Sequence, residues 1–490
     1  LNLIFITSDE MRGDAPSFMG NPDCRTPNID RFAERGVRFR NHFTVHGKCV
    51  PSRVAMVTGR YTHTDGFRTV NTTNLLPPGT PNLLTALKAA NYESACFGHN
   101  HKWEDMWGDN KKSSGCVDYQ SYTEDYFADL IDTVHPSPEP GPDAVEIIEA
   151  PDNCLEVKRI TGPRSGFMGD NRALQAQRYL KEVRDRERPF ALFVDFGLPH
   201  PGYEIEEPYF SMYDRDAITP FEHGIGENAP LHLRKMREIR GRHATEPLLR
   251  QLQAVYYGMC SKVDYEIGQV FQAIEDEGLW ENTVVVFTAD HGDFAGQYGI
   301  PEKWDTAMND CILHVPCVLH APGLKGARWI EGLTEHTDLT PTILELLGLE
   351  ADWVMHGESL LPIVAGAKRK DAVFADGGHE EPMRNRFSWQ GRKVDANGRA
   401  NLPTHGKQAV YEDFPDSMAR VKMVRTDRWK LVIRETGGNE LYDMPADPDE
   451  MNNLYGREGT MDVTNDLMLR MLEWCLRTDT DLPYQERVGA

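Results

Sequence analysis

The chain begins with the run Leu1-Asn2-Leu3-Ile4-Phe5-Ile6-Thr7, which is followed directly by Ser8-Asp9-Glu10. An apolar run without regular polar alternation is typical of a strand buried on both faces, as in a parallel sheet covered by helices. Polar residues that follow such a strand lie at the carboxyl edge of the sheet, where open α/β folds place their active sites. The run therefore predicts an α/β fold with Asp9 and Glu10 at a functional edge.

Apolar strands of the same kind alternate with helical patterns along most of the chain. Predicted strands cover 37–45, 94–98, 189–196, 283–289 and 315–320, and predicted helices cover 26–36, 82–91, 171–186, 248–274 and 338–347. This alternation predicts a large, mainly parallel sheet sandwiched by helices. Two stretches between these elements, 105–165 and 203–246, are polar or charged, and we expect them to be irregular excursions.

The pattern changes after about residue 370. Short strands predicted at 421–426, 429–434 and 440–442 are joined by turns, and a final helix is predicted at 463–477. These elements predict a smaller C-terminal α+β domain that carries an antiparallel sheet. The expected organisation is a catalytic α/β domain over residues 1–370 and the smaller domain over residues 371–490.

The composition limits the partners of the protein. The 490 residues carry a formal net charge of −23, which argues against binding to nucleic acid. No apolar run approaches the roughly 20 residues of a membrane span, so we expect no membrane contact. Nine cysteines without Cys-x-x-Cys spacing give no zinc or redox motif.

The compartment and the oligomeric state stay open at this point. Leu1 lies inside a predicted strand, so we expect sequence before it, either an initiator methionine or a removed signal peptide. The first of these would suit a cytoplasmic protein and the second a periplasmic or secreted one.

A second informative stretch, Lys48-Cys49-Val50-Pro51-Ser52-Arg53, leads to Thr58-Gly59-Arg60. Pro51 fits the first turn of a helix, so Cys49 is predicted at the N-terminal mouth of that helix. Free backbone N–H groups and the helix dipole favour an anion there, and Arg53 projects toward the same point from four residues on. The stretch predicts a nucleophile in an anion pocket. A buried free cysteine before an ordinary helix is the alternative that this stretch alone leaves open.

This stretch resembles the Cys-x-Pro-Ser-Arg…Thr-Gly-Arg motif of the formylglycine-dependent sulfatases, a family of the alkaline phosphatase-like superfamily. Further segments similar to that family cover nearly the whole chain in the same order. They are Ile6-Thr7-Ser8-Asp9-Glu10-Met11-Arg12-Gly13-Asp14, Pro199-His200-Pro201, Ala289-Asp290-His291-Gly292 with Lys303, His336-Thr337-Asp338-Leu339-Thr340-Pro341-Thr342, and Glu440-Leu441-Tyr442-Asp443 with Asn452-Asn453-Leu454. The resemblance implies that a formylglycine-generating maturase oxidises Cys49 to formylglycine, whose hydrate attacks the sulfur of a sulfate ester.

The resemblance also implies a metal site. Its ligands would be Asp9, Glu10, Cys49, Asp290 and His291. Hard oxygen ligands of this kind suit calcium, with magnesium as the alternative. The family usually has aspartate, one methylene shorter, where this chain has Glu10.

The remaining catalytic roles follow from the same resemblance. Arg53 and Lys303 would hold the sulfate oxygens, His200 would protonate the leaving alcohol, and His101 would take the proton whose removal expels sulfate. His99 stands where the family commonly has a lysine that contacts sulfate. We expect His99 to bind substrate as a cation that titrates near neutral pH.

The substrate is predicted less directly. The two excursions and the run 377–408 are expected to form walls of the pocket. Arg386 and Trp389 in that run suit a sugar ring with a second anionic group, so we expect a sulfate ester of a carbohydrate, as a small molecule or an oligosaccharide. The alternatives are a phosphonate monoester or phosphodiester hydrolase with the same nucleophile, and an inactive homologue that only binds anions.

Overall fold

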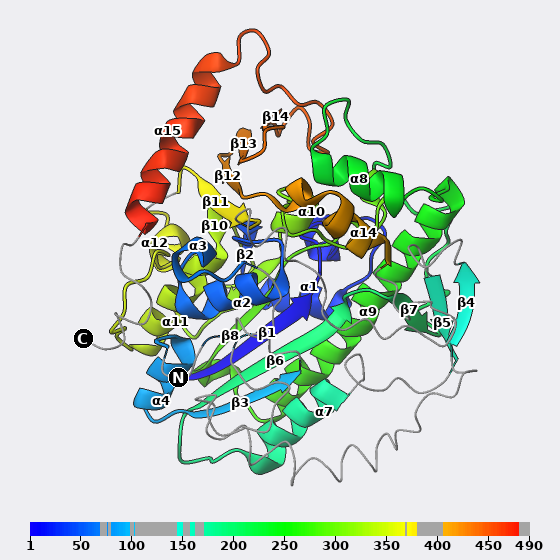
Figure 1. The fold of residues 1–490 in the computed structure, drawn as a ribbon. Helices are drawn as coiled ribbons and strands as arrows, with labels where there is room; N and C mark the ends of the chain where they lie inside the picture. The colour runs from blue at the N-terminus through cyan, green and yellow to red at the C-terminus, as the bar shows by residue number, and fades with distance from the viewer. Residues whose placement is uncertain are drawn as a thin grey trace.

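The structure, a computed structural model, describes residues 1–68, 76, 80–98, 102, 145–149, 157–161, 171–367, 370–379 and 405–479 (Figure 1). Four of the predicted site residues, namely His99, His101, Arg386 and Trp389, lie outside the described residues. All of the other predicted site residues lie inside them. Within these ranges, no helix combines the length and the apolar character that a membrane crossing requires.

Seven strands form the main sheet, in the order β10-β2-β9-β8-β1-β6-β3 (Figure 1). Their bounds are β1 Asn2–Asp9, β2 Val37–Phe43, β3 Glu93–Gly98, β6 Phe190–Pro199, β8 Thr283–Ala289, β9 Cys317–His320 and β10 Arg328–Glu335. Strand β9 is antiparallel to its neighbours β2 and β8, whereas the other neighbouring strands are parallel. The expected large, mainly parallel sheet is confirmed, and β1 lies between β8 and β6.

Helices cover both faces of this sheet. They are α1 Pro27–Arg35, α7 Asn171–Arg178 and α9 Glu246–Asp276 on one face, and α2 Cys49–Thr58, α4 Leu83–Ala89 and α11 Leu339–Leu347 on the other. Side chains of a strand point alternately to the two faces. Accordingly, Ile4 and Ile6 of β1 pack in the core with α9, whereas Leu3 and Phe5 pack in the core with α2 and α4. The continuous apolar run of β1 is therefore explained by burial on both sides.

The C-terminal part of the chain forms a second sheet, which has four antiparallel strands in the order β11-β12-β13-β14. Its strands and helices are β11 Val373–Gly377, α14 His405–Asp413, β12 Val421–Arg425, β13 Trp429–Arg434, β14 Glu440–Asp443 and α15 Met461–Thr478. Helix α15 packs Leu467, Met471 and Trp474 against Val424 and Leu431 of this sheet. The expected antiparallel sheet and final helix are confirmed, and the domain boundary at residue 370 stays a prediction.

Some elements differ from the expectations. The stretch 203–246, expected to be irregular, contains β7 Tyr203–Glu206 and α8 Leu231–Ile239. Strand β7 pairs with β5 Val157–Ile160, which in turn pairs with β4 Val145–Glu149, and these two strands lie in the stretch 105–165. The rest of that stretch lies largely outside the described residues.

The sequence did not predict β10, because exposed polar residues at this sheet edge interrupt its apolar pattern. The remaining short elements are α3 Thr62–Asp65, α10 Asp310–Leu313, α12 Leu361–Val364, the 3-10 turns Ser17–Met19, Trp280–Asn282, Gln297–Gly299, His336–Asp338 and Pro415–Met418, and the π turn Tyr179–Val183.

Candidate active site

Cys49 is the first residue of α2, and every residue of this helix is buried. Lys48 before it is extended, and Gly59 ends the helix with a φ of 70°, a left-handed conformation that glycine adopts without strain. Ser52 fixes the first turn, because its hydroxyl donates to the carbonyl oxygen of Asp290 at 2.5 Å. The predicted helix with Cys49 at its mouth is therefore confirmed.

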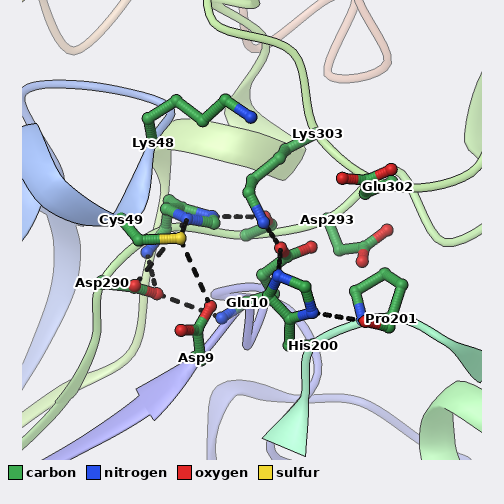
Figure 2. A network of polar contacts seen from close by, with 12 residues as sticks. Asp9, Glu10, Lys48, Cys49, His200, Pro201, Asp290, Asp293, Glu302 and Lys303 are labelled. Atoms are coloured by element: carbon green, nitrogen blue, oxygen red, sulfur yellow. Dashed lines mark hydrogen bonds and ion pairs between the residues drawn. The ribbon is translucent and has the colours of Figure 1, made fainter. Parts of the chain in front are cut away.

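Three neighbouring strands of the main sheet deliver the other polar groups. Asp9 ends β1 and Glu10 follows it, His200 follows β6, and Asp290 and His291 follow β8. Because β6 and β8 are both parallel to β1, their carboxyl ends meet at one edge of the sheet. Figure 2 shows the side chains of Asp9, Glu10, His200 and Asp290 converging near Cys49. The structure confirms that these residues meet at one edge of the sheet, and their functional roles stay a prediction.

The Cys49 side chain lies among groups that can bind a metal. Its Sγ lies 3.7 Å from Asp9 Oδ1 and 3.2 Å from His291 Nε2. Burial, together with the negative charges of Asp9 and Asp290, raises the pKa of the Cys49 thiol well above its ordinary value. An unmodified cysteine in this structure is therefore held as the neutral thiol.

Arg53 is completely buried and contacts three carboxylates. Its Nε donates to Asp290 Oδ2 at 2.8 Å, Nη1 to Asp195 Oδ1 at 3.0 Å and Nη2 to Asp9 Oδ2 at 3.1 Å. Burial alone would lower the pKa of Arg53, but these carboxylates raise it above its ordinary value. In this structure the guanidinium orients the carboxylates at the base of the site, and its predicted contact with sulfate stays a prediction.

The donor set fits a hard divalent cation. Ligand atoms of Asp9, Cys49, Asp290 and His291 lie within 4.8 Å of one another, and the same holds for those of Asp9, Glu10, Cys49 and His200. Burial raises the pKa of Asp290, an effect that Arg53 opposes and Asp9 reinforces. A bound cation would favour the charged form of both carboxylates and would offset their mutual repulsion.

Glu10 lies between two of the predicted catalytic residues (Figure 2). Its carboxylate contacts Lys303 Nζ, and its Oε1 lies 3.2 Å from His200 Nε2. The backbone of Glu10 is in the left-handed region, with a φ of 68°, which turns its side chain away from the line of β1. On the other side of the His200 ring, Nδ1 faces the carbonyl oxygen of Pro201, so Nε2 is the nitrogen that faces the site.

Behind the site lies a buried charged network that the sequence reasoning missed. Lys48 Nζ lies 3.2 Å from Asp305 Oδ1, which also accepts a hydrogen bond from Tyr411 of α14 at 2.9 Å. Next to it, Lys407 of α14 donates to Glu302 at 2.5 Å. These contacts attach α14 to the residues that flank Cys49 and Lys303. In the sequence, these charged residues stand directly beside the predicted site residues. Their partners could not be predicted, because the residues that pair are far apart in the chain.

A second missed residue is Asp195, the one acidic residue within the apolar strand β6. It is fully buried, and it accepts from Arg53 and, at 2.5 Å, from Lys102 Nζ. The side chain of Lys102 therefore points into the protein, toward Asp195. A buried charge needs a partner, and this requirement explains why Lys102 turns inward.

Eight of the predicted site residues are thus brought together. They are Asp9, Glu10, Cys49, Arg53, His200, Asp290, His291 and Lys303. A comparison with protein families agrees with the resemblance seen in the sequence, because the model of the Sulfatase family matches residues 1–349. The chain belongs to the sulfatase family. This sulfatase is accordingly a sulfuric ester hydrolase, and a second family model, described as N-sulphoglucosamine sulphohydrolase, C-terminal, matches residues 394–476.

Known proteins similar to this sulfatase include both sulfatases and phosphonate hydrolases. The "Multifunctional alkaline phosphatase superfamily protein PehA" of Trinickia caryophylli is 27% identical over 514 residues, which cover 97% of this chain and 95% of PehA. Phosphonate monoester hydrolase SpPMH from Silicibacter pomeroyi has a similar fold, with a TM-score of 0.73, 21% identity, and 98% of this chain and 96% of that chain covered. The protein BT4656, solved in complex with its substrate D-glucosamine-2-N,6-O-disulfate, gives a TM-score of 0.70 at 19% identity, with 99% of both chains covered. These structures support the fold of the alkaline phosphatase-like superfamily.

Proposed function

We propose that this sulfatase hydrolyses a sulfate monoester of a carbohydrate, with Cys49 matured to formylglycine and a divalent cation bound beside it. The observation that carries the proposal is the position of Cys49. It lies at the mouth of α2, with its Sγ 3.7 Å from Asp9 and 3.2 Å from His291, in a site that also holds Arg53 and Lys303. A formylglycine hydrate at this position would supply the attacking hydroxyl group.

Asp9, Asp290 and His291 would hold the cation, with Glu10 at the margin of the site. When bound, a divalent cation would offset the negative charge of the sulfate oxygens and favour ionisation of the attacking hydroxyl. Calcium is the expected ion, with magnesium as the alternative, because carboxylate oxygens dominate the donor set. Arg53 contributes by holding the Asp9 and Asp290 carboxylates in fixed positions.

Lys303 and His200 both contact Glu10 (Figure 2). We assign to Lys303 the binding of a sulfate oxygen, because a buried ammonium group stabilises developing negative charge at close range. We assign to His200 the transfer of a proton to the leaving alcohol through Nε2, the nitrogen that faces the site. The roles of His99 and His101 in sulfate binding and sulfate release stay predictions.

The carbohydrate substrate rests on two similarities. The C-terminal family model is named for an N-sulphoglucosamine sulphohydrolase, and BT4656 was solved with a sulfated glucosamine as its substrate. Arg386 and Trp389, predicted to contact a second anionic group of the sugar, lie outside the described residues. A screen of sulfated mono- and disaccharides, with the matched desulfated sugars as controls, tests this part. Release of sulfate from aryl sulfate but from none of the sugars would contradict it.

Hydrolysis of phosphonate monoesters or phosphodiesters is the second candidate function. PehA is described as multifunctional, and the fold is shared with a phosphonate monoester hydrolase. An aryl sulfate and an aryl phosphonate monoester with the same leaving group separate the two candidates. The proposal predicts a higher kcat/KM for the sulfate, and the reverse order would favour the second candidate. An inactive anion-binding homologue would hydrolyse neither compound, even with Cys49 fully matured.

A further inference from the structure

Helix α15 carries apolar side chains on two separate faces. One face, with Leu467, Met471 and Trp474, is buried against the C-terminal sheet. The other face is exposed and forms what we call the α15 stripe. It consists of Met461 (63% exposed), Met468 (43%), Leu469 (56%), Leu472 (56%) and Leu476 (72%). Consecutive members of the stripe are seven, one, three and four positions apart, and at about 100° per residue all five lie on one side of the helix.

This stripe is unusual for the surface of this protein. Among the described residues, most of the large apolar side chains that are exposed belong to it, and the others are Leu1, Tyr265 and Val354. Figure 1 shows α15 at the outer margin of the fold, separate from the strand ends that carry the active site. Single exposed apolar residues are common, but a contiguous row of them marks a surface that binds another apolar surface.

We propose that the α15 stripe is the interface of a homodimer in which two copies of α15 pack antiparallel. The stripe is complementary to itself in that orientation. In an antiparallel pair, each step forward along one helix is a step back along the other. If Met461 of one copy faces Leu476 of the other, Met468 therefore faces Leu469. A two-fold axis then passes close to Met468 and Leu469, as an isologous interface requires.

The charges beside the stripe support the antiparallel orientation. The N-terminal half of α15 carries the acidic residues Asp462 and Asp466, whereas the C-terminal half carries Arg470, Glu473 and Arg477 and is net positive. Within each helix, Arg470 pairs with Asp466 at 2.9 Å and Arg477 with Glu473 at 3.4 Å. In the register given above, Asp462 lies near Arg477 of the second copy, and Asp466 lies near Arg470 of the second copy. A parallel pair would place like charges and like helix ends side by side, which is unfavourable.

Electrostatic repulsion between the two negatively charged chains opposes the apolar contact. Two chains of net charge −23 repel each other at long range. At physiological salt this repulsion is screened beyond about 8 Å, so it opposes the apolar contact only weakly. The dimer is therefore expected to persist, and not to dissociate, when the salt concentration is raised further.

Sedimentation of the full chain over a range of concentrations tests the proposal. The wild type is expected to be a dimer, and Leu472→Glu is expected to raise the dissociation constant by about 100-fold or more, since a charge in the centre of an apolar interface is poorly tolerated. Tyr265→Glu is the matched control, because it places the same charge at an exposed side chain on α9, and it is expected to remain a dimer. A wild type that is monomeric at all concentrations overturns the proposal. In that case another segment or another protein would cover the stripe. So does a Leu472→Glu variant that dimerises like the wild type.

Disulfide cross-linking tests the orientation in the folded protein, independently of any destabilisation by a buried charge. Met468→Cys lies near the two-fold axis and is expected to form a covalent dimer on oxidation. Leu476→Cys is expected to form none, because the two copies of this position would be offset by about 15 residues, roughly 22 Å along the helix. Equal cross-linking at both positions would overturn the antiparallel arrangement. Because α15 is remote from Cys49, arylsulfatase activity is expected to be unchanged in Leu472→Glu.

Discussion

Replacement of Arg53 by methionine is expected to destabilise the fold and to make its stability more dependent on calcium. The guanidinium lies within 3.1 Å of three buried carboxylates, and Asp195 among these retains Lys102 as a partner. Removing one partner of a buried ion pair costs about 3–5 kcal/mol, and we expect a loss of this size in the free energy of unfolding measured with a chelator. Calcium at about 100 times its dissociation constant stabilises a protein by about 2.7 kcal/mol. The gain is expected to be larger in Arg53→Met, because the cation takes over the neutralisation of Asp9 and Asp290.

Urea unfolding of both proteins, with chelator and with calcium, measures these differences. Arg428→Met is the matched control, since this arginine forms a 2.7 Å ion pair with Asp443 at the surface, with 64% of its side chain exposed. Exposed ion pairs contribute little to stability because solvent and salt screen them, so the control should stay close to the wild type in both conditions. Arg53→Met within about 1 kcal/mol of the wild type in chelator would refute the structural role of Arg53. If the difference in the free energy of unfolding between Arg53→Met and the wild type is the same with chelator and with calcium, the link to the cation site is refuted.

Three further predictions concern buried groups around the site. Burial lowers the pKa of His46 from 6.5 to about 4, so the folded protein keeps this imidazole neutral while the unfolded chain takes up a proton below pH 6.5. The free energy of unfolding is therefore expected to fall by about 3 kcal/mol between pH 6.5 and 4 because of this group. In His46→Gln, the urea midpoint is expected to depend less on pH over this range. Asp305→Asn removes the carboxylate that pairs with buried Lys48 and is expected to lower the free energy of unfolding by about 3–5 kcal/mol. The double variant with Lys48→Met should recover most of this loss in a double-mutant cycle. Additive losses would argue against a stabilising pair. Calorimetry with calcium is expected to show weaker binding by about tenfold or more for Glu10→Ala but not for Glu10→Asp, which keeps the carboxylate near Asp9, and unchanged binding in both would remove Glu10 from the cation site.

The sequence predicts those parts of the fold that local patterns determine. The strand at 283–289 consists mainly of apolar residues because both of its faces are buried, and Pro51 with Gly59 delimits the helix that carries Cys49. Strand β10 is an exception, because only its pairing with β2 makes its mixed polar sequence a strand. Long-range partners are the other exception, since Asp195 and Lys102 are adjacent only after β6 has joined the sheet.

The same distinction applies to the site. The residues that end β1, β6 and β8 could be assigned from the sequence, because the carboxyl ends of parallel strands always lie at one edge. The position of Glu10 against Lys303 and His200 could not be assigned, since it depends on a left-handed backbone and on the extra methylene of glutamate. The contact of Lys48 with Asp305 depends on how the C-terminal part of the chain packs behind the site.

Turnover by this sulfatase is expected to require the formylglycine derived from Cys49, and Cys49→Ser tests this most directly. A serine hydroxyl can accept the sulfuryl group, but it has no second hydroxyl whose proton loss would expel sulfate. We expect Cys49→Ser to complete at most one turnover on an aryl sulfate, and the mass spectrum of the peptide around residue 49 should show one added sulfuryl group. Steady-state turnover by Cys49→Ser at the rate of the matured wild type, with no such adduct, would contradict this expectation.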